Sequence, residues 1–239
     1  MQKITISLKI AGILLALWGA MGCEKVIDVP IRDSDTKVVI EGLVTQGTGP
    51  HTVRVSKSAP FGASGTGEPI DRAVVTIRTT AGQTDTLRPV GGGRYQTRRL
   101  VGTPGVTYTL AVVLDGTAYA ATSTMPQPVL LDTLTQEVAA AGRRVVQAHY
   151  DDPADVANFY RFVVYVNDQR LDGVFVSDDR LRNGIRARTP IGTGPDAPEI
   201  NPGDRVRVRM ECIDARVYDY LKSLADLLGG QALTPANPN

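Results

Sequence analysis

The chain of 239 residues is 42% hydrophobic and 21% charged, which is typical of a globular protein that buries a core. The formal net charge is +1, and the chain beyond Lys3 and Lys9 is close to neutral. This balance argues against a nucleic-acid partner, because such proteins carry a basic excess. Only two cysteines are present, Cys23 and Cys212, so a framework of several disulfides is excluded.

Residues 1–22 have the layout of a signal peptide. Lys3 and Lys9 accompany an uncharged apolar run, Ile10–Trp18, that is too short to span a bilayer core of about 30 Å. We therefore expect cleavage after Gly22. The alternative is a buried helix of a soluble protein.

The residues around the expected cleavage point resemble the lipobox of bacterial lipoproteins. Gly22 and Cys23 fit its pattern, whereas Ala20 replaces the usual leucine and Met21 is larger than the usual small residue. The resemblance implies lipidation of Cys23 with several acyl chains, palmitate among them, and each buried CH₂ contributes about 0.8 kcal/mol to anchoring. We expect a lipid-anchored protein of the cell envelope, at the outer membrane and either periplasmic or surface-exposed. An ordinary signal peptide with an unrelated cysteine is the alternative.

Residues 23–36 carry the lipidated cysteine and a polar segment that we expect to act as a tether. Residues 37–125 then alternate apolar and polar side chains between turn residues, which predicts about seven short strands and a β-sandwich. The strands are expected at Val38–Val44, Thr52–Val55, Ala73–Arg78, Thr84–Leu87, Arg94–Thr97, Thr107–Leu114 and Thr117–Thr124. Asp115–Gly116 predicts a two-residue hairpin turn between the last two strands.

This segment also resembles known sandwiches. The order Glu68-Pro69-Ile70, Gly93-x-Tyr95, Pro104-Gly105 and Tyr108-x-Leu110-x-Val112 is similar to that of transthyretin-like or carboxypeptidase-regulatory domains. The N-terminal domain is therefore expected to be a transthyretin-like or immunoglobulin-like β-sandwich.

Pro126 and Pro128 predict a boundary, followed by a second β-rich module over residues 129–239. Its expected strands are Val129–Val138, Arg143–His149, Phe159–Val166, Val174–Val176 and Arg205–Met210. The Gly- and Pro-rich stretch Arg182–Pro202 is expected to form a mobile loop. Alternation within Arg205–Met210 predicts one solvated strand face, with an anion-binding patch as the alternative; its arginines are Arg205, Arg207 and Arg209.

One amphipathic helix is predicted at the C-terminal end of this module. Asp214 is suited to cap its start and Gly229 to end it. Apolar residues recur every three or four positions, which predicts one core-facing side. They are Val217, Tyr220, Leu221, Leu224, Leu227 and Leu228.

Many short segments along the chain belong to one pattern; they are Cys23–Asp28, Val38–Gly42, Ser56–Pro60, Tyr108–Pro126, Asp151–Pro153, Asn158–Phe162, Tyr218–Tyr220 and Pro235–Pro238. Together these segments resemble domain-of-unknown-function family 4249. The resemblance implies a lipoprotein from a Gram-negative phylum rich in surface nutrient-uptake lipoproteins, and it supplies no catalytic residues. Similar members continue past the Asn-Pro segment with a further strand, so this chain, ending at Asn239, is expected to lack a C-terminal sheet edge.

Candidate catalytic residues are few. His51 and His149 are the two histidines, and Ser56 and Asp151 are available as partners, but no Gly-x-Ser-x-Gly motif is present. No His-x-x-x-His or Cys-x-x-Cys spacing predicts zinc. We therefore expect no catalytic site. Cys212 is expected to be a small buried residue, with a reactive thiol as the alternative.

Two acidic clusters offer oxygen ligands, but calcium needs six to eight converging oxygens and neither cluster has a known calcium-loop pattern. The clusters are Asp151, Asp152 and Asp155, and Asp178 with Asp179. The first three are weak metal candidates, and we expect neither a metal nor a cofactor.

These features favour a non-enzymatic binding module, an accessory of an outer-membrane uptake system with a TonB-dependent type of transporter as its partner. One alternative is a hydrolase of surface polymers, for which a concave site and a carboxylate pair of raised pKa are expected, with Asp151 and Asp179 as the first residues to mutate. Another is a structural or adhesive surface module, which predicts a flat apolar patch without a pocket. The binding residues and the oligomeric state do not follow from the sequence.

Overall fold

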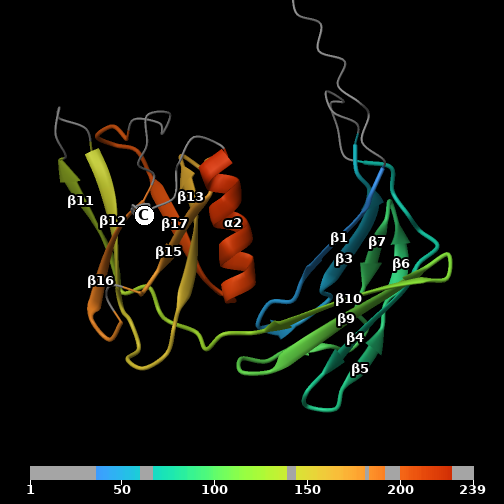
Figure 1. Ribbon diagram of the computed structural model, residues 1–239. Coiled ribbons are helices and arrows are strands. Elements are labelled where there is room, and N and C mark those ends of the chain that lie inside the picture. The colour runs from blue at the N-terminus through green and yellow to red at the C-terminus, as the bar shows by residue number, and fades with distance from the viewer. Residues whose placement is uncertain (1–35, 60–66, 139–143, 181–182, 192–199, 228–239) are drawn as a thin grey trace, which may run out of the picture. The chain divides into compact units, whose positions relative to one another are not determined.

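The computed structural model describes residues 36–59, 67–138, 144–180, 183–191 and 200–227. All of these except Thr36 and Ala59 belong to one compact unit. The expected signal peptide, Cys23, most of the tether and the C-terminal tail lie outside the described residues. No helix in the described part of the chain is long and apolar enough to cross a membrane. The fold is mainly β with one C-terminal helix, as the sequence predicted (Figure 1).

The described core forms two hydrophobic clusters, one from residues 38–125 and the other from residues 129–212. We call the elements around the first cluster the N-terminal module and those around the second the C-terminal module.

Two antiparallel sheets of four strands enclose the core of the N-terminal module. The first has the order β1 (Val38–Leu43), β3 (Thr52–Lys57), β7 (Arg94–Gln96), β6 (Arg88–Gly91). The second has the order β10 (Thr117–Thr124), β9 (Thr107–Leu114), β4 (Val74–Thr79), β5 (Thr84–Thr86). A short pair is formed by β2 (Gly47–Thr48) and β8 (Val101–Gly102). The sequence analysis did not predict these two-residue strands, which are too short to show a period, and it also missed β6.

The β9–β10 hairpin confirms the predicted turn. Leu114 pairs with Thr117, so Asp115 and Gly116 form a two-residue loop. Both adopt positive φ angles, 50° and 81°, which the primed hairpin turns require and which Asp-Gly tolerates well.

Alternation along the strands places every second side chain in this core. Val53, Val55 and Tyr95 come from the first sheet, and Val75, Ile77 and Val112 from the second. Tyr95 is only 1% exposed, and its hydroxyl donates to the carbonyl of Ile70 at 2.8 Å and accepts from the amide of Ala73 at 2.9 Å. The hydroxyl therefore satisfies two backbone groups of the segment that leads into β4.

The C-terminal module also has two antiparallel sheets. One has the order β11 (Thr133–Val138), β12 (Arg144–Asp151), β16 (Arg186–Ile191). In the other, β13 (Phe159–Val166) pairs on one side with β14 (Gln169–Arg170) and β15 (Phe175–Asp178), and it also pairs with β17 (Val206–Ile213). Tyr150, Tyr160 and Phe162 form an aromatic centre between the sheets.

β16 corrects the expectation that Arg182–Pro202 is a mobile loop. Residues 186–191 pair in register with β12, from Arg186 opposite Asp151 to Ile191 opposite Val146. Ala187, Thr189 and Ile191 are buried, so the segment has the period of a strand. The prediction failed because Gly and Pro around the segment concealed a six-residue alternation; Pro190 is tolerated because β16 is an edge strand.

Helix α2 (Ala215–Leu227) has the predicted start but a different buried side. The Asp214 carboxylate accepts a hydrogen bond from the amide of Val217 at 2.9 Å, which caps the helix. The fully buried residues are Tyr218 and Ala225, whereas Val217, Tyr220 and Leu227 are 40%, 67% and 84% exposed. Leu221 and Leu224 of the predicted apolar face are half-buried, so this face points only in part toward the core.

Tyr218 determines which side of α2 faces the core. The Tyr218 ring contacts Phe159 of β13 at 5.0 Å between centroids, and its hydroxyl donates to Asp178 of β15 at 2.6 Å. Burial of a large ring with a satisfied hydroxyl outweighs burial of Val217 and Tyr220 on the neighbouring side.

Candidate functional site

In the N-terminal module, β1 is an edge strand of the first sheet and β10 is an edge strand of the second, and each pairs with a neighbour on one side only. β10 is the longer of the two, with eight residues, and seven of them are exposed. Its sequence, Thr-Ala-Tyr-Ala-Ala-Thr-Ser-Thr, contains no charge, no proline and no glycine. An edge of this kind presents a row of backbone N–H and C=O groups to which another strand can pair.

Small side chains leave the core open beside this edge. Residues opposite each other in an antiparallel pair share a face, so the partners of the core residues Val112 and Leu110, which are Tyr119 and Ala121, face inward. Ala121 is nevertheless exposed, and Leu110 and Tyr119 are only partly buried. The interior of the module is therefore accessible next to β10.

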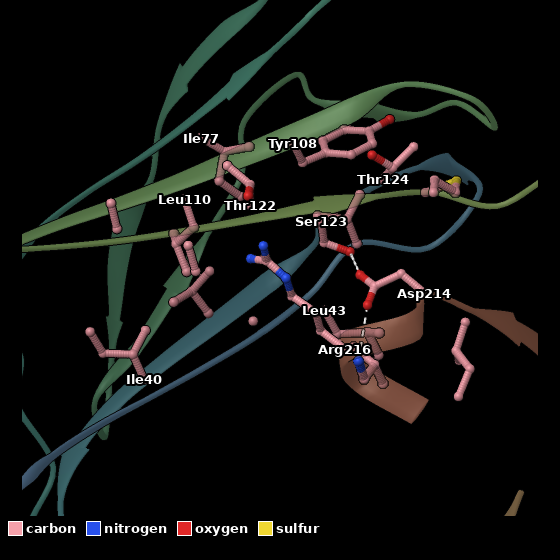
Figure 2. Close-up of a pocket in the computed structure, with 18 of the residues that line it drawn as sticks. Ile40, Leu43, Ile77, Tyr108, Leu110, Thr122, Ser123, Thr124, Asp214 and Arg216 are labelled. Atoms are coloured by element: carbon pink, nitrogen blue, oxygen red, sulfur yellow. Dashed lines mark hydrogen bonds between the residues drawn. The ribbon is translucent and has the colours of Figure 1, made fainter. Parts of the chain in front are cut away.

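A groove of 510 Å³ occupies this opening. The residues that line it in the N-terminal module are mainly apolar and include Val44, Tyr119, Ala121 and Met125. Figure 2 labels Ile40 and Leu110 among them. An apolar groove beside a free strand edge is suited to an extended segment that pairs with β10 and inserts alternate side chains.

Three other edge strands of the described chain, β5, β6 and β16, have features that hinder such pairing. β6 carries Arg88 and Pro89 and has an irregular register, and β5 is only three residues long. In the C-terminal module, β16 contains Arg186, Arg188 and Pro190. Charges, proline, bulges and short length are the usual means of protecting an edge, and β10 has none of them.

The weak metal candidates do not form one site. Asp151 is exposed and forms an ion pair with Arg186 at 3.7 Å. Asp152 is buried and accepts hydrogen bonds from the Tyr160 hydroxyl at 2.5 Å and the Gly184 amide at 3.3 Å. Asp155 is exposed in a turn with φ of 65°. Among the described residues, no group of three or more His, Cys, Asp or Glu side chains is arranged to hold a metal ion.

Asp178 and Asp179 are both buried but have different environments. Burial alone would raise the pKa of Asp178, but hydrogen bonds from Arg180 and Tyr218 hold it below its ordinary value. Burial raises the pKa of Asp179, and the nearby Asp152 raises it further, although the Asn158 amide donates to Asp179 at 2.8 Å. A carboxyl of raised pKa beside a second carboxyl is what the hydrolase alternative predicted, but none of these acids lines the groove.

The histidines lie in different modules. The Nδ1 atom of His51 accepts from the Thr45 amide at 3.5 Å, and burial lowers the pKa of this histidine. His149 is hydrogen-bonded through Nε2 to Thr135 at 2.7 Å. In the described part of the chain neither histidine is bonded to a serine or a carboxylate, and Ser56 and Asp151 belong to different modules.

Cys212 is half-buried at the end of β17. Burial raises the pKa of its thiol, and the sulfur accepts a hydrogen bond from the Val129 amide at 3.2 Å. A raised pKa lowers the fraction of reactive thiolate, which favours the prediction of a structural cysteine over a reactive one.

The alternating arginines of the segment Arg205–Met210 all have acidic partners. Arg205 and Arg207 share Asp168, each at 3.6 Å, and Arg209 lies 2.9 Å from Glu211. Each of these exposed guanidinium groups therefore lies beside a carboxylate, which favours the prediction of a solvated strand face.

The structure is thus that of a mainly β protein with an apolar groove beside the free edge of β10. A family model described as "Domain of unknown function (DUF4249)" matches residues 24–237. The chain belongs to this family. No curated protein and no solved structure matches it.

Proposed function

We propose that this chain is a non-enzymatic binding module, anchored in the cell envelope through lipid on Cys23, that serves as an accessory of an outer-membrane uptake system. The observation that carries the proposal is the uncharged, unpaired edge of β10 beside the apolar groove. The partner is a transporter of the TonB-dependent type, which contributes an extended segment with apolar residues at alternate positions.

The chemistry of the groove supports recognition of a strand. Pairing along β10 would satisfy its free backbone groups, which gives affinity without regard to sequence. Side chains of the added strand that point inward would contact Leu110, Tyr119 and Ile40, and these contacts would give specificity. Burying the partly exposed Leu110 and Tyr119 would contribute about 25 cal/mol for each Å² of apolar surface removed from water.

The test compares two alanines of the same strand. Ala121 lines the groove, whereas Ala118 is exposed on β10 and does not line it. A photo-crosslinking residue at position 121 of the full chain in native membranes is expected to capture an outer-membrane barrel protein, and the same residue at position 118 is expected to capture much less. Ala121→Lys should abolish co-purification of that protein because an inward-pointing charge blocks edge pairing; Ala118→Lys should leave it intact.

Three results would overturn the proposal. They are the absence of any barrel protein from both crosslinks, equal loss in the Ala118→Lys and Ala121→Lys chains, and crosslinking at position 121 to a second copy of the chain. The last would show that the edge serves self-association.

The hydrolase alternative is favoured by one observation, the raised pKa of Asp179. It requires access of a polymer to this carboxyl, which is 4% exposed and hydrogen-bonded to the Asn158 backbone. Any hydrolysis of surface polymers by the full chain that is lost in Asp179→Asn and in Asp151→Asn would establish it. Full activity in both variants would exclude these two carboxylates as the catalytic pair.

A further inference from the structure

The arginines of the two modules differ in how they are neutralised. Seven arginines of the C-terminal module have an acidic partner within 4 Å; these are Arg161, Arg180, Arg186, Arg188, Arg205, Arg207 and Arg209. In the N-terminal module only Arg72 and Lys57 form ion pairs among the described residues, with Asp115 and Glu68.

The N-terminal module therefore has an excess of unpaired positive charge. Residues 37–125 contain nine Lys or Arg and five Asp or Glu, a net charge of +4. Two arginines, Arg54 and Arg94, even lie opposite each other on β3 and β7. Like charges at such positions destabilise a sheet.

Three of the unpaired arginines line a single pocket of 620 Å³ within the N-terminal module. Arg88 is the first residue of β6, and Arg98 and Arg99 follow β7 in the chain. The β6–β7 pairing brings them together, because Arg88 lies opposite Gln96, two residues before Arg98. All three are exposed.

The acid Asp85 is close enough to Arg98 for an electrostatic attraction, but its hydrogen bonds go to the backbone. One oxygen of its carboxylate accepts hydrogen bonds from the amides of Arg98, Arg99 and Leu100 at 2.8, 2.8 and 3.0 Å. No ion pair within 4 Å joins Asp85 to either arginine in the described residues. Asp85 thus fixes the segment that carries Arg98 and Arg99 while their side-chain donors stay available.

A buried hydroxyl also borders the pocket. Thr97 is 4% exposed, and its Oγ1 atom accepts a hydrogen bond from the His51 amide at 2.8 Å. Because that bond uses a lone pair of the oxygen, the hydroxyl proton remains available for a ligand.

We propose that this arginine pocket, defined by Arg88, Arg98, Arg99 and Thr97, binds an anion that carries phosphate groups. Guanidinium groups bind phosphate oxygens through paired N–H donors. A single carboxylate ligand has only two oxygens and cannot accept paired hydrogen bonds from all three guanidinium groups. A phosphate ester or a polyphosphate has the charge and the number of oxygens to engage all three. The site shares no residue with the groove beside β10 and is independent of the function proposed for that groove.

The test uses the full chain in nonionic detergent at low ionic strength, titrated with tripolyphosphate in a calorimeter. Arg98→Gln is expected to weaken binding about tenfold or more, because it removes charge-assisted hydrogen bonds to the anion and a factor of ten corresponds to about 1.4 kcal/mol. Arg98→Lys should fall between Arg98→Gln and the wild type, since lysine keeps the charge but not the paired donors. The matched control is Arg78→Gln on β4, an exposed and unpaired arginine that does not line the pocket; we expect its affinity to stay within about twofold of the wild type, since few surface substitutions exceed 0.5 kcal/mol.

Mixed micelles with phosphatidic acid distinguish the two sources of phosphate. Competition of this lipid with tripolyphosphate would identify a lipid headgroup as the ligand, and no competition would identify a soluble phosphate; both outcomes support the site. Three outcomes would overturn it: no binding of tripolyphosphate, an equal loss in Arg78→Gln and Arg98→Gln, or binding of citrate with the affinity of tripolyphosphate. The last would show that the pocket does not select phosphate.

Discussion

Removal of the Asp85 carboxylate should destabilise the N-terminal module strongly. Its single oxygen holds three consecutive backbone N–H groups, of Arg98, Arg99 and Leu100. In Asp85→Ala all three lose their partner. The Leu100 bond is fully buried, so its amide would remain unsatisfied at about 1–3 kcal/mol, while water can replace part of the other two bonds. We expect a total loss of about 3 kcal/mol in the free energy of unfolding, and about 1 kcal/mol for Asp85→Asn, which keeps one neutral acceptor.

Urea unfolding of the full chain measures this loss. Far-ultraviolet circular dichroism is the appropriate signal, because the one tryptophan, Trp18, precedes the described residues. The transitions of the two modules should be fitted separately if they do not coincide. Glu41→Gln, an exposed acid of the same module without an ion pair in the described residues, is the control and should change stability by less than about 0.5 kcal/mol. A loss below that value in Asp85→Ala would refute the role given to the carboxylate.

The Asp85 carboxyl should also make the stability of the N-terminal module depend on pH. Burial tends to raise the pKa of Asp85, but the three amide donors outweigh burial and hold the pKa below its ordinary value. The unfolded chain therefore takes up a proton first as the pH falls, so stability rises with pH in this range. The contribution of Asp85 is complete above the unfolded-state pKa of about 3.9 and is lost as the pH falls through the lower folded-state value. This part of the acid sensitivity should be absent from Asp85→Asn.

Two further substitutions test the interior of each module. Tyr95→Phe removes the hydroxyl that bonds to Ile70 and Ala73, and it should cost about 1–3 kcal/mol in urea unfolding; no loss would show that water replaces both bonds. Asp179→Asn should stabilise the C-terminal module at neutral pH, because burial and a neighbouring carboxylate raise the pKa of Asp179 and so disfavour its charged form in the folded state. With a raised folded-state pKa, stability falls as the pH rises from about 4, so the advantage of Asn over Asp in melting temperature should shrink on acidification. An advantage that is the same at every pH would contradict this.

Local patterns predicted the elements whose determinants are close in sequence. Alternation predicted the long strands, Asp115–Gly116 predicted the hairpin, and Asp214 predicted the start of α2. The buried side of α2 was predicted only in part, because its apolar residues cover a wide arc. Which part of that arc is buried depends on Phe159 and Asp178, which are distant in the chain.

The candidate sites were harder to predict because they depend on which strands lack a neighbour and which arginines lack an acidic partner. The sequence shows that β10 is uncharged, but not that it has a neighbour on one side only. In the sequence, Arg88, Arg98 and Arg99 look no different from Arg205, Arg207 and Arg209. In the structure, the second group has acidic partners, whereas the first group has no ion pair among the described residues. Only the strand pairing reveals which charges and which backbone groups are unsatisfied.

The free edge of β10 also has a consequence for the behaviour of the protein in quantity. An uncharged strand edge does not discriminate between a partner and a second copy, so self-pairing grows with the square of the concentration while pairing with a partner saturates. Overproduction of the chain relative to whatever occupies the edge would therefore favour aggregates built through β10. The ratio of this protein to its occupant, more than its folding stability, would then set how much of it remains soluble.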